Sequence, residues 1–310
     1  MSTVICLGEV LFDLLANELG VSRELVASWT PLPGGAPANV ACALVKMGDR
    51  SRFIGCVGTD EAGEKLTEKL TAQGVDLTGL QRHPTAPTRQ VYVVRTADGD
   101  RIFGDFGGIE TDKFADTQLS VVPREVFIGA DFLLLGTLAL AYPLSAASTW
   151  QAVEFATAQG VKIVVDINWR PTFWTSPTAA IPEIKRLLAS ADYVKFAKEE
   201  AELIYGQTSP QLLCQYLPNA VGIFVTDGGN VCEYWLDGIT GEQPAFKVNA
   251  IDTTGAGDAF VAGSIHQLGA SQSADAIVRY AAAAGALTTL KPGAIDAQPT
   301  DAEIHQFLSA

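Results

Sequence analysis

Short runs rich in apolar and β-branched residues alternate along this 310-residue chain with segments of helical spacing. The runs predicted as strands are Val4–Leu7, Ser51–Val57, Phe132–Leu135, Lys162–Asp166, Tyr193–Phe196 and Val221–Thr226. The segments predicted as helices are Pro37–Met47, Ala62–Gln73, Ala146–Ala158, Glu199–Tyr205 and Ala256–Leu268. This order of strand, crossover helix and strand predicts an α/β fold with a central, mostly parallel sheet covered by helices on both faces.

Two stretches, residues 12–33 and 88–107, break the alternation. In the second, Gln90–Thr96 alternates between apolar and polar residues, and Asp98-Gly99-Asp100 is typical of a hairpin turn. We expect the two stretches to pair as a small antiparallel β sheet, a lid over the strand ends where open α/β sheets bind ligands. Because no linker or repeat divides the sequence, we expect residues 1–310 to form a single domain.

Composition narrows the classes of partner. The formal net charge is −14 and the sequence pI is near 4.6, whereas binding to nucleic acid or to an anionic membrane requires clustered lysine and arginine. Hydrophobic residues make up 48% of the sequence, which is enough to build a large core. We therefore expect no nucleic acid and no membrane partner, and we favour a small-molecule ligand.

The cysteines and the hydropathy of the sequence indicate in which cellular compartment the protein is expected. The five cysteines are odd in number and show no C-x-x-C spacing, which predicts free thiols. The most apolar run, Phe132–Tyr142, is far shorter than the roughly 20 residues that span a bilayer. No export signal is visible before the first predicted strand. These features predict a reduced, cytoplasmic environment.

The stretch DTTGAGDAF, from Asp252 to Phe260, places a glycine turn and a carboxylate where a helix is predicted to begin. Glycines let the backbone turn so that successive N–H groups point outward, and the unpaired amides and positive dipole end of a helix favour an anion such as phosphate. Asp258 beside that anion makes sense if it handles a proton or organises a counter-ion, which points to phosphoryl transfer. The alternative is an ordinary turn with a helix-start aspartate.

The segment PGGAPAN, residues 33–39, also introduces a helix through a glycine turn. A small ligand can approach the backbone there while Asn39 donates or accepts hydrogen bonds. Glu9 and Asp13 follow the first predicted strand, and Asp13 is suited to accept from two sugar hydroxyls. Carboxylates and an asparagine suit a neutral polyol, and a plain turn with a helix start is the alternative.

Two further charged segments follow predicted strands. DINWR, residues 166–170, offers an acceptor, an amide and a fixed cation, and Arg170 can clamp phosphate or sugar oxygens. KEEAE, residues 198–202, sets carboxylates at a helix start, where one can bind Mg²⁺ through water. The alternatives are a salt-bridged strand end and solvated charges that interact with the helix dipole.

These ordered motifs resemble those of the PfkB, or ribokinase-like, carbohydrate kinases, and most of all those of fructokinases. The resemblance covers nearly the whole chain and implies a ribokinase-like fold. The matching residues are Gly8-Glu9 with Asp13, Gly34-Gly35 to Asn39, Phe53-Ile54-Gly55, Val57-Gly58 with Asp60, Gly74-Val75-Asp76, Asp166 with Asn168 and Arg170, and Asp252 to Asp258.

The resemblance implies ATP-dependent phosphorylation of a primary sugar hydroxyl, with the C6 hydroxyl of D-fructose as the first hypothesis. Asp258 is implied as the base, with Arg170 near the phosphoryl group. The implied anion hole consists of Gly255, Ala256 and Gly257 with the amide of Asp258. The residues implied to bind the sugar are Asp13, Gly34, Gly35, Asn39, Arg101 and Asp258.

The resemblance also implies a nucleotide and metal region. The residues implied to lie near ATP are Asn168, Thr226, Gly228, Gly255, Gly257, Ala282 and Gly285. Glu200 is implied to bind Mg²⁺ through water, because Ala197 stands where the family's N-x-x-E pattern often has asparagine. Asp252 and Thr254 are implied to bind a monovalent cation such as K⁺, and the lid is implied to form a homodimer.

Other functions remain open from the sequence. Within the same class, the acceptor is ribose, a nucleoside or 2-keto-3-deoxygluconate. A different class is a non-catalytic sugar-binding regulator that keeps the fold, since a fold does not establish a function; the intact Asp258 argues against it. A P-loop is absent, and a dehydrogenase is disfavoured because Phe260 stands where the dinucleotide fingerprint requires a third glycine.

Overall fold

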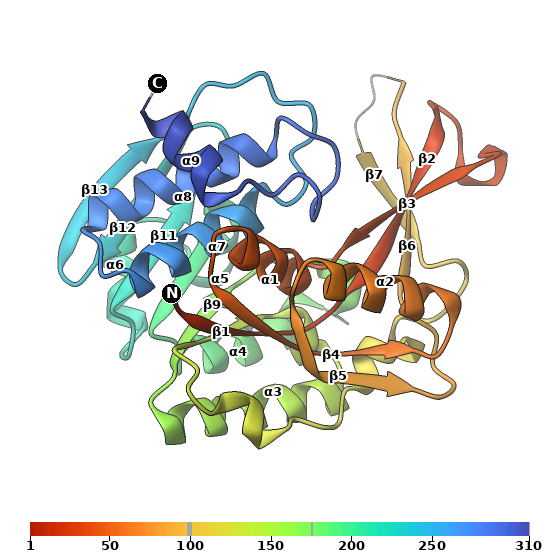
Figure 1. Ribbon diagram of the computed structural model, residues 1–310, viewed down its shortest axis with the longest axis horizontal. Coiled ribbons are helices and arrows are strands. Elements are labelled where there is room, and N and C mark those ends of the chain that lie inside the picture. The colour runs from red at the N-terminus through yellow and green to blue at the C-terminus, as the bar shows by residue number, and fades with distance from the viewer. Residues whose placement is uncertain (98–100, 175, 310) are drawn as a thin grey trace.

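The computed structural model describes residues 1–97, 101–174 and 176–309 and contains two sheets (Figure 1). In the described part of the chain the larger sheet has the order β13-β12-β11-β10-β9-β8-β1-β4-β5. Its strands are β1 (Thr3–Leu7), β4 (Arg50–Gly58), β5 (Asp76–His83), β8 (Phe132–Gly136), β9 (Lys162–Asp166), β10 (Tyr193–Ala197), β11 (Gly222–Thr226), β12 (Val231–Leu236) and β13 (Ile239–Pro244). Neighbours from β5 to β11 pair in parallel, and β12 and β13 add antiparallel pairs at one edge. The predicted mostly parallel sheet is confirmed.

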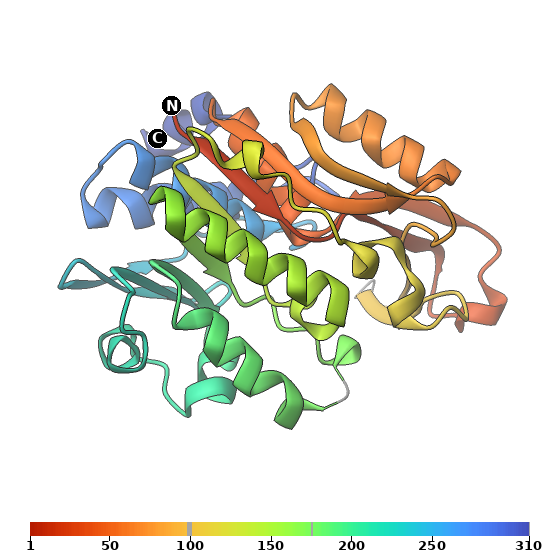
Figure 2. The same cartoon turned by 90° about the horizontal axis from the view of Figure 1, so that it is seen from below.

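Helices cover both faces of this sheet (Figures 1 and 2). One face is covered by α1 (Ala36–Lys46), α2 (Glu61–Ala72), α7 (Ala256–Gly269), α8 (Ala274–Thr288) and α9 (Asp301–Leu308). The other is covered by α3 (Pro143–Gln159), α4 (Pro177–Leu188), α5 (Lys198–Tyr205) and α6 (Pro210–Leu213). Successive residues of a strand point to opposite faces of the sheet. Val4 and Cys6 of β1 therefore lie in the apolar cluster on the side of α1 and α7, and Ile5 and Leu7 lie in the cluster on the side of α3 and α4.

The smaller sheet protrudes at one side of the molecule in the order β3-β2-β6-β7 (Figure 1). Its strands are β2 (Leu11–Leu19), β3 (Trp29–Gly34), β6 (Gln90–Arg95) and β7 (Arg101–Asp105). The pairs β2/β3 and β6/β7 are antiparallel, and the central pair β2/β6, which joins the two hairpins, is parallel. The two stretches 12–33 and 88–107 do pair, but the strands that join them are parallel, so the expected antiparallel pairing holds only within each stretch. The turn expected at residues 98–100 lies outside the described residues.

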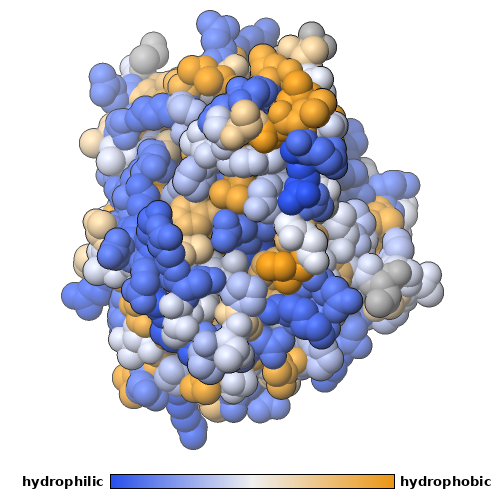
Figure 3. Space-filling model, turned by 90° about the vertical axis from the view of Figure 1, so that its right-hand side faces the viewer, coloured by the Kyte–Doolittle hydropathy of each residue, from blue (hydrophilic) through white to orange (hydrophobic). Residues whose placement is uncertain are grey.

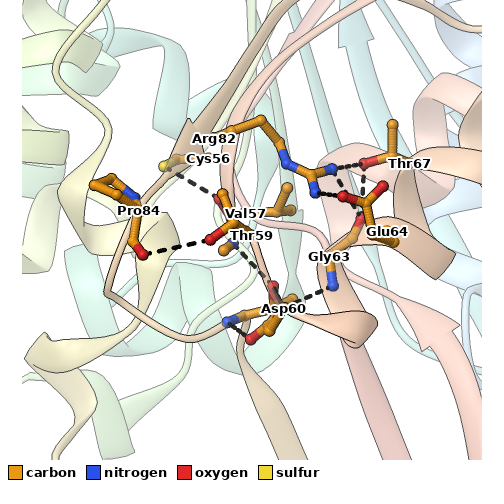
Figure 4. Close-up of polar contacts among 11 residues, drawn as sticks. Cys56, Val57, Thr59, Asp60, Gly63, Glu64, Thr67, Arg82 and Pro84 are labelled. Carbon is orange, nitrogen blue, oxygen red and sulfur yellow. Dashed lines mark hydrogen bonds and ion pairs between the residues drawn. The ribbon is translucent and has the colours of Figure 1, made fainter.

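A network around Asp60 ties the small sheet to the body of the molecule (Figure 4). Asp60 caps α2 by accepting from the N–H of Gly63 at 2.8 Å, and it also accepts from the N–H of Thr88 at 2.8 Å, just before β6. Burial alone would raise the pKa of Asp60, but these hydrogen bonds together lower it. Arg82 of β5 donates to Thr67 of α2 at 2.7 Å, so β5 and α2 are joined at the same corner.

In the described ranges, no helix is both long enough and apolar enough to pass through a membrane.

Candidate active site

Helix α7 begins at a sharp glycine turn. Gly255 precedes it in the left-handed conformation, with φ of +80°, and a Cβ at this position would lie 3.0 Å from the Cβ of Ala294. Gly257 is exposed in the first turn, and Asp258 follows it, half-buried. The first amides of a helix have no partner within it, so this turn offers N–H groups and a positive dipole end to an anion.

Asp258 faces α1 across the start of α7. The side-chain Nδ2 of Asn39, which is 4% exposed, donates to Oδ2 of Asp258 at 2.7 Å. Burial raises the pKa of Asp258 to about 6, with the negative charge of Asp166 adding to the effect and Asn39, Lys195 and Arg170 opposing it. A carboxyl group with this pKa is ionised at neutral pH and accepts a proton readily, as a general base requires.

Lys195 is a member of this group that the sequence analysis did not single out. It lies in β10, is 8% exposed, and donates through Nζ to Oδ1 of Asp166 at the end of β9, at 3.1 Å. A Cβ built on Gly257 would lie 3.5 Å from this ammonium, so the lysine also borders the turn of α7. The available indication was a lysine between two apolar residues of a predicted buried strand, Val194 and Phe196.

The predicted sugar-binding residues lie at the junction of the small sheet and the body. A Cβ on Gly34 would lie 3.3 Å from Oδ2 of Asp13, and a Cβ on Gly35 would lie 2.5 Å from the carbonyl oxygen of Glu9, so both glycines allow a close approach. Glu9 also accepts from the N–H of Ala36 at 3.1 Å. Burial raises the pKa of Asp13 to about 6, opposed by the nearby arginines. Asp13 is therefore ionised at neutral pH and available to accept from hydroxyl groups.

Arg101 connects the small sheet to the DTTGAGD motif. Its Nη2 lies 2.5 Å from Oδ2 of Asp252, which also accepts from the N–H of Gly293 at 2.8 Å. The other carboxylate oxygen accepts from the N–H and the hydroxyl of Thr254, at 3.1 and 2.7 Å. Asp252 is thus engaged by four donors and joins β7, the loop before α7 and the loop after α8.

The segment after β9 adopts a strained turn beside α5. Asn168 has φ of +44°, and the exposed Arg170 donates to the carbonyl of Trp169 at 3.0 Å. Glu200 accepts from the N–H groups of Trp169 and Ala197, each at 2.7 Å. Both carboxylate oxygens of Glu200 are therefore engaged by the backbone. The described residues contain no group of three or more His, Cys, Asp or Glu side chains suited to hold a metal ion.

The predicted nucleotide residues lie farther along the sheet edge and on α8. Thr226 ends β11 and donates to the carbonyl of Phe196 at 3.2 Å, and Gly228 follows it with φ of +50°. On α8, a Cβ at Gly285 would lie 3.1 Å from the carbonyl of Ala256, so this glycine lets α8 pack closely on the start of α7. Ala282 packs against an apolar cluster formed by β11, β12, α7 and α8. Among the described residues, no hydrogen bond joins these four positions to Asp258.

The structure therefore brings part of the predicted site into direct contact. Asp258 meets Asn39 across the glycine turn, Arg101 meets Asp252 and with it Thr254, and Asp13 meets Gly34. Asp166, Ala197 and Thr226 are the last residues of β9, β10 and β11, so they lie at the carboxyl edge of the parallel sheet. This edge is where open α/β sheets bind their ligands.

Comparison with known proteins identifies the class. The model of the pfkB family carbohydrate kinases matches residues 1–301. The chain therefore belongs to the pfkB family of carbohydrate kinases. A probable fructokinase-2 of Arabidopsis thaliana is 33% identical over 315 residues, covering 98% of this chain and 95% of that protein. Fructokinase-1 of Zea mays is 32% identical over 316 residues, covering 98% of this chain and 97% of that protein.

Solved structures share the architecture and include bound ligands. Fructokinase with bound ATP from Xylella fastidiosa is 27% identical, has a TM-score of 0.87, and covers 99% of this chain and 98% of its own. Fructokinase from Vibrio cholerae O395, bound to fructose, ADP and calcium ion, is 29% identical, has a TM-score of 0.84, and covers 99% of both chains. The ribokinase-like fold is thus confirmed, and similar kinases hold a nucleotide, in some cases with a metal ion.

Proposed function

We propose that this protein is an ATP-dependent fructokinase that transfers the γ-phosphoryl group to the C6 hydroxyl of D-fructose, giving fructose 6-phosphate. The observation that carries the proposal is the half-buried Asp258, bonded to Asn39 at 2.7 Å and set in the glycine turn that opens α7. The relatives named fructokinase, and the solved fructokinase with fructose and ADP, support the choice of sugar.

Asp258 acts as the general base in this proposal. Phosphoryl transfer has a loose transition state, so a carboxylate of modest basicity need only accept the hydroxyl proton late in the reaction. The amides of Gly255, Ala256, Gly257 and Asp258 hold oxygens of the transferring group, and Arg170 adds a positive charge beside them. When bound, ATP supplies the phosphoryl group, and Mg²⁺ held through water by Glu200, close to Asn168, offsets its negative charge.

The remaining predicted residues hold the two substrates. Asp13, Gly34, Gly35, Asn39 and Arg101 bind the sugar, and the small sheet acts as a lid that excludes water from the transfer. The nucleotide side is formed by Thr226 and Gly228 with Ala282 and Gly285. A monovalent cation such as K⁺ binds near Asp252 and Thr254.

The test of the substrate is coupled ADP release across fructose, glucose, ribose, adenosine and 2-keto-3-deoxygluconate with Mg-ATP. The proposal predicts the highest kcat/KM for fructose. A higher value for ribose, adenosine or 2-keto-3-deoxygluconate would reassign the acceptor within the family. Sugar binding by calorimetry without ADP release from any acceptor would favour the non-catalytic regulator instead.

We also propose a single kinase domain over residues 1–310 that pairs through its lid as a cytoplasmic homodimer. The apolar side chains of Leu19, Leu25 and Ile102 on and beside the small sheet are 49%, 72% and 50% exposed, and Figure 3 shows hydrophobic patches among hydrophilic groups on this side. All five cysteines are free, as a reducing compartment allows. Light scattering of the purified protein tests the dimer, and a monomer mass at micromolar concentration argues against it.

A further inference from the structure

We propose that Lys195 is a positioning residue of the phosphoryl-transfer site: its ammonium holds Asp166 beside the glycine turn of α7 and balances the negative charge around Asp258. The inference rests on the proposed function, because it assigns a part in that same reaction. Neither the sequence motifs nor the family resemblance assigned a role to this lysine.

The ammonium group of Lys195 lies between the end of β9 and the start of α7. Lys195 lies in β10 between Val194 and Phe196, both 0% exposed, so its side chain leaves a tightly packed strand. Nζ donates to Asp166 of the neighbouring strand at 3.1 Å, and a Cβ on Gly257 would lie 3.5 Å from it. One fixed cation therefore contacts the acid at the end of β9 and borders the anion-binding turn of α7.

Charged side chains from several elements surround Asp258. Negative charge comes from Asp166 of β9, and positive charge comes from Lys195 of β10 and from Arg170. Glu9 after β1 also lies near, but burial raises its pKa to about 7, so it is mostly neutral below that pH. Glu200 of α5 adds a carboxylate on the side of Lys195. Arg170 is exposed, whereas Lys195 is buried, so the lysine charge is less screened by water. Lys195 is thus the buried cation available to offset the buried acids.

The lysine keeps its charge in spite of burial. Burial alone would lower its pKa, but the nearby carboxylates outweigh this effect and raise the pKa of Lys195 to about 12. It is therefore an ammonium throughout the neutral range. Without it, the exposed Arg170 would be left to offset the charges of Asp166 and Asp258, and the two acids would take up a proton at higher pH. A protonated Asp258 cannot act as a base.

The chain offers a matched control at the other end of the same strands. Lys162, the first residue of β9, forms an ion pair with Asp192, just before β10, with Nζ 2.8 Å from Oδ1. This pair has the same chemistry and joins the same two strands, but it lies at their amino ends, away from Asp258. The side chain of Lys162 is 53% exposed and that of Lys195 is 11% exposed, so Lys162→Met controls for the loss of a lysine–aspartate pair between these strands and not for the loss of a buried charge.

The experiment compares Lys195→Met and Lys162→Met with the wild type by the pH dependence of kcat/KM for fructose. The same proteins, labelled with ¹³C-carboxyl aspartate and free of substrate, are titrated by NMR, with Asp258→Asn used to assign the signal. We expect Lys195→Met to move the low-pH fall of kcat/KM, and the aspartate titration, upward by about one pH unit or more. kcat should fall by a larger factor than the KM for fructose rises, and Lys162→Met should leave both titrations unchanged.

Second variants keep the proposal falsifiable. The double variant with Lys195→Met and Asp166→Asn should return the low-pH fall towards the wild-type position, because one negative charge is removed with the cation. If Lys195→Met does not fold, Asp166→Asn alone should move the titration of Asp258 downward. A folded Lys195→Met with the wild-type titration, or an unmoved titration in Asp166→Asn, overturns the proposal. A wild type that phosphorylates no sugar overturns the proposed function, and the NMR titration still decides the role of Lys195.

Discussion

At the scale of one residue, Asp258 must be basic enough to accept a proton and must also be ionised at neutral pH. It is withdrawn from water far enough for its pKa to rise to about 6, and it must still be ionised to accept a proton. Asn39, Lys195 and Arg170 favour the ionised form, and burial with Asp166 disfavours it. As a result, the Asp258 carboxylate is more basic than that of an ordinary aspartate and is still ionised at neutral pH.

Replacing this base tests its role most simply. General-base help is typically worth about 10²–10⁴-fold in rate, so Asp258→Asn should lower kcat by a factor in this range and change the affinity for fructose little. Steady-state kinetics and calorimetry measure the two effects. Asp275→Asn is a matched control, because Asp275 lies in the first turn of α8 and bonds to Tyr234, and it should keep near-normal turnover. Near-normal turnover of Asp258→Asn would show that Asp258 is not the base.

The raised pKa also has a consequence for stability. A carboxyl group whose pKa rises from 3.8 to about 6 on folding is more easily protonated in the folded state, so its ionisation destabilises the fold as pH rises through that interval. Asp258→Asn removes this cost, so its Tm should exceed that of the wild type at pH 8, and the gain should shrink as the pH is lowered towards 4. Thermal unfolding monitored by circular dichroism measures it; a gain that is larger at pH 4 would contradict the assignment.

The pH dependence of activity follows from the same groups. Asp13 and Asp258 both have a pKa raised to about 6, mainly by burial, and both act in their ionised forms in the proposed mechanism. kcat/KM should therefore fall below about pH 6, more steeply than for one titrating group. A pH–rate profile between pH 5 and pH 9 measures this, and constant kcat/KM down to pH 5 would be inconsistent with it.

At the scale of elements, an ion pair joins strand β7 of the lid to the loop before α7. Arg101 of β7 reaches Asp252 at 2.5 Å, and the side chains are 26% and 8% exposed. Arg101→Ala should raise the KM for fructose and increase ATP hydrolysis in the absence of sugar relative to transfer, because the lid closes less completely. Arg95→Ala is the control, since Arg95 bonds within the lid to the carbonyls of Ala16 and Asn17. Equal hydrolysis-to-transfer ratios in the two variants would contradict this role.

The Asp60 network is the element-scale contact that we expect to matter for stability. Asp60 caps α2 and also accepts from the N–H and the hydroxyl of Thr88, which is 2% exposed. Asp60→Ala should lower the free energy of unfolding by about 1–3 kcal/mol, since a cap is lost and buried donors are left unpaired. Urea unfolding measures this, with Asp76→Ala as the control because the side chain of Asp76 is exposed, accepts from the exposed Thr78 and lies 4.0 Å from Nε of Arg52. An equal loss of unfolding free energy in Asp60→Ala and Asp76→Ala would contradict a special role for the Asp60 network.

The strands that the sequence predicted best are the buried ones in the middle of the large sheet. The buried runs of β1, β8, β9, β10 and β11 were found because both faces of the sheet are covered there and most of the residues are apolar. Edge strands β5 and β13 were missed, because their exposed polar residues give no apolar run. Helices α8 and α4 were also missed; Pro182 lies inside α4, where a proline argues against a helix.

At the scale of the whole molecule, the candidate site has one part that could be predicted from the sequence and another part that depends on the fold. The turn from Asp252 to Asp258 is continuous in sequence, so its chemistry could be inferred before the fold was known. The contacts of Lys195 with Asp166 and of Arg101 with Asp252 could not, because they depend on which strands are neighbours and on how the small sheet meets the body. Packing of α8 on α7 likewise gives Gly285 a structural contact that its sequence position did not indicate.

The most direct test of the central claim follows the phosphorus atom itself. Purified protein is incubated with Mg-ATP and D-fructose, and the products are identified by ³¹P and ¹³C NMR. The account predicts a phosphate ester at C6 of fructose formed together with ADP, with little inorganic phosphate, and almost none of this product with Asp258→Asn at equal protein concentration. Inorganic phosphate as the main product, or an ester at another position of the sugar, would contradict it.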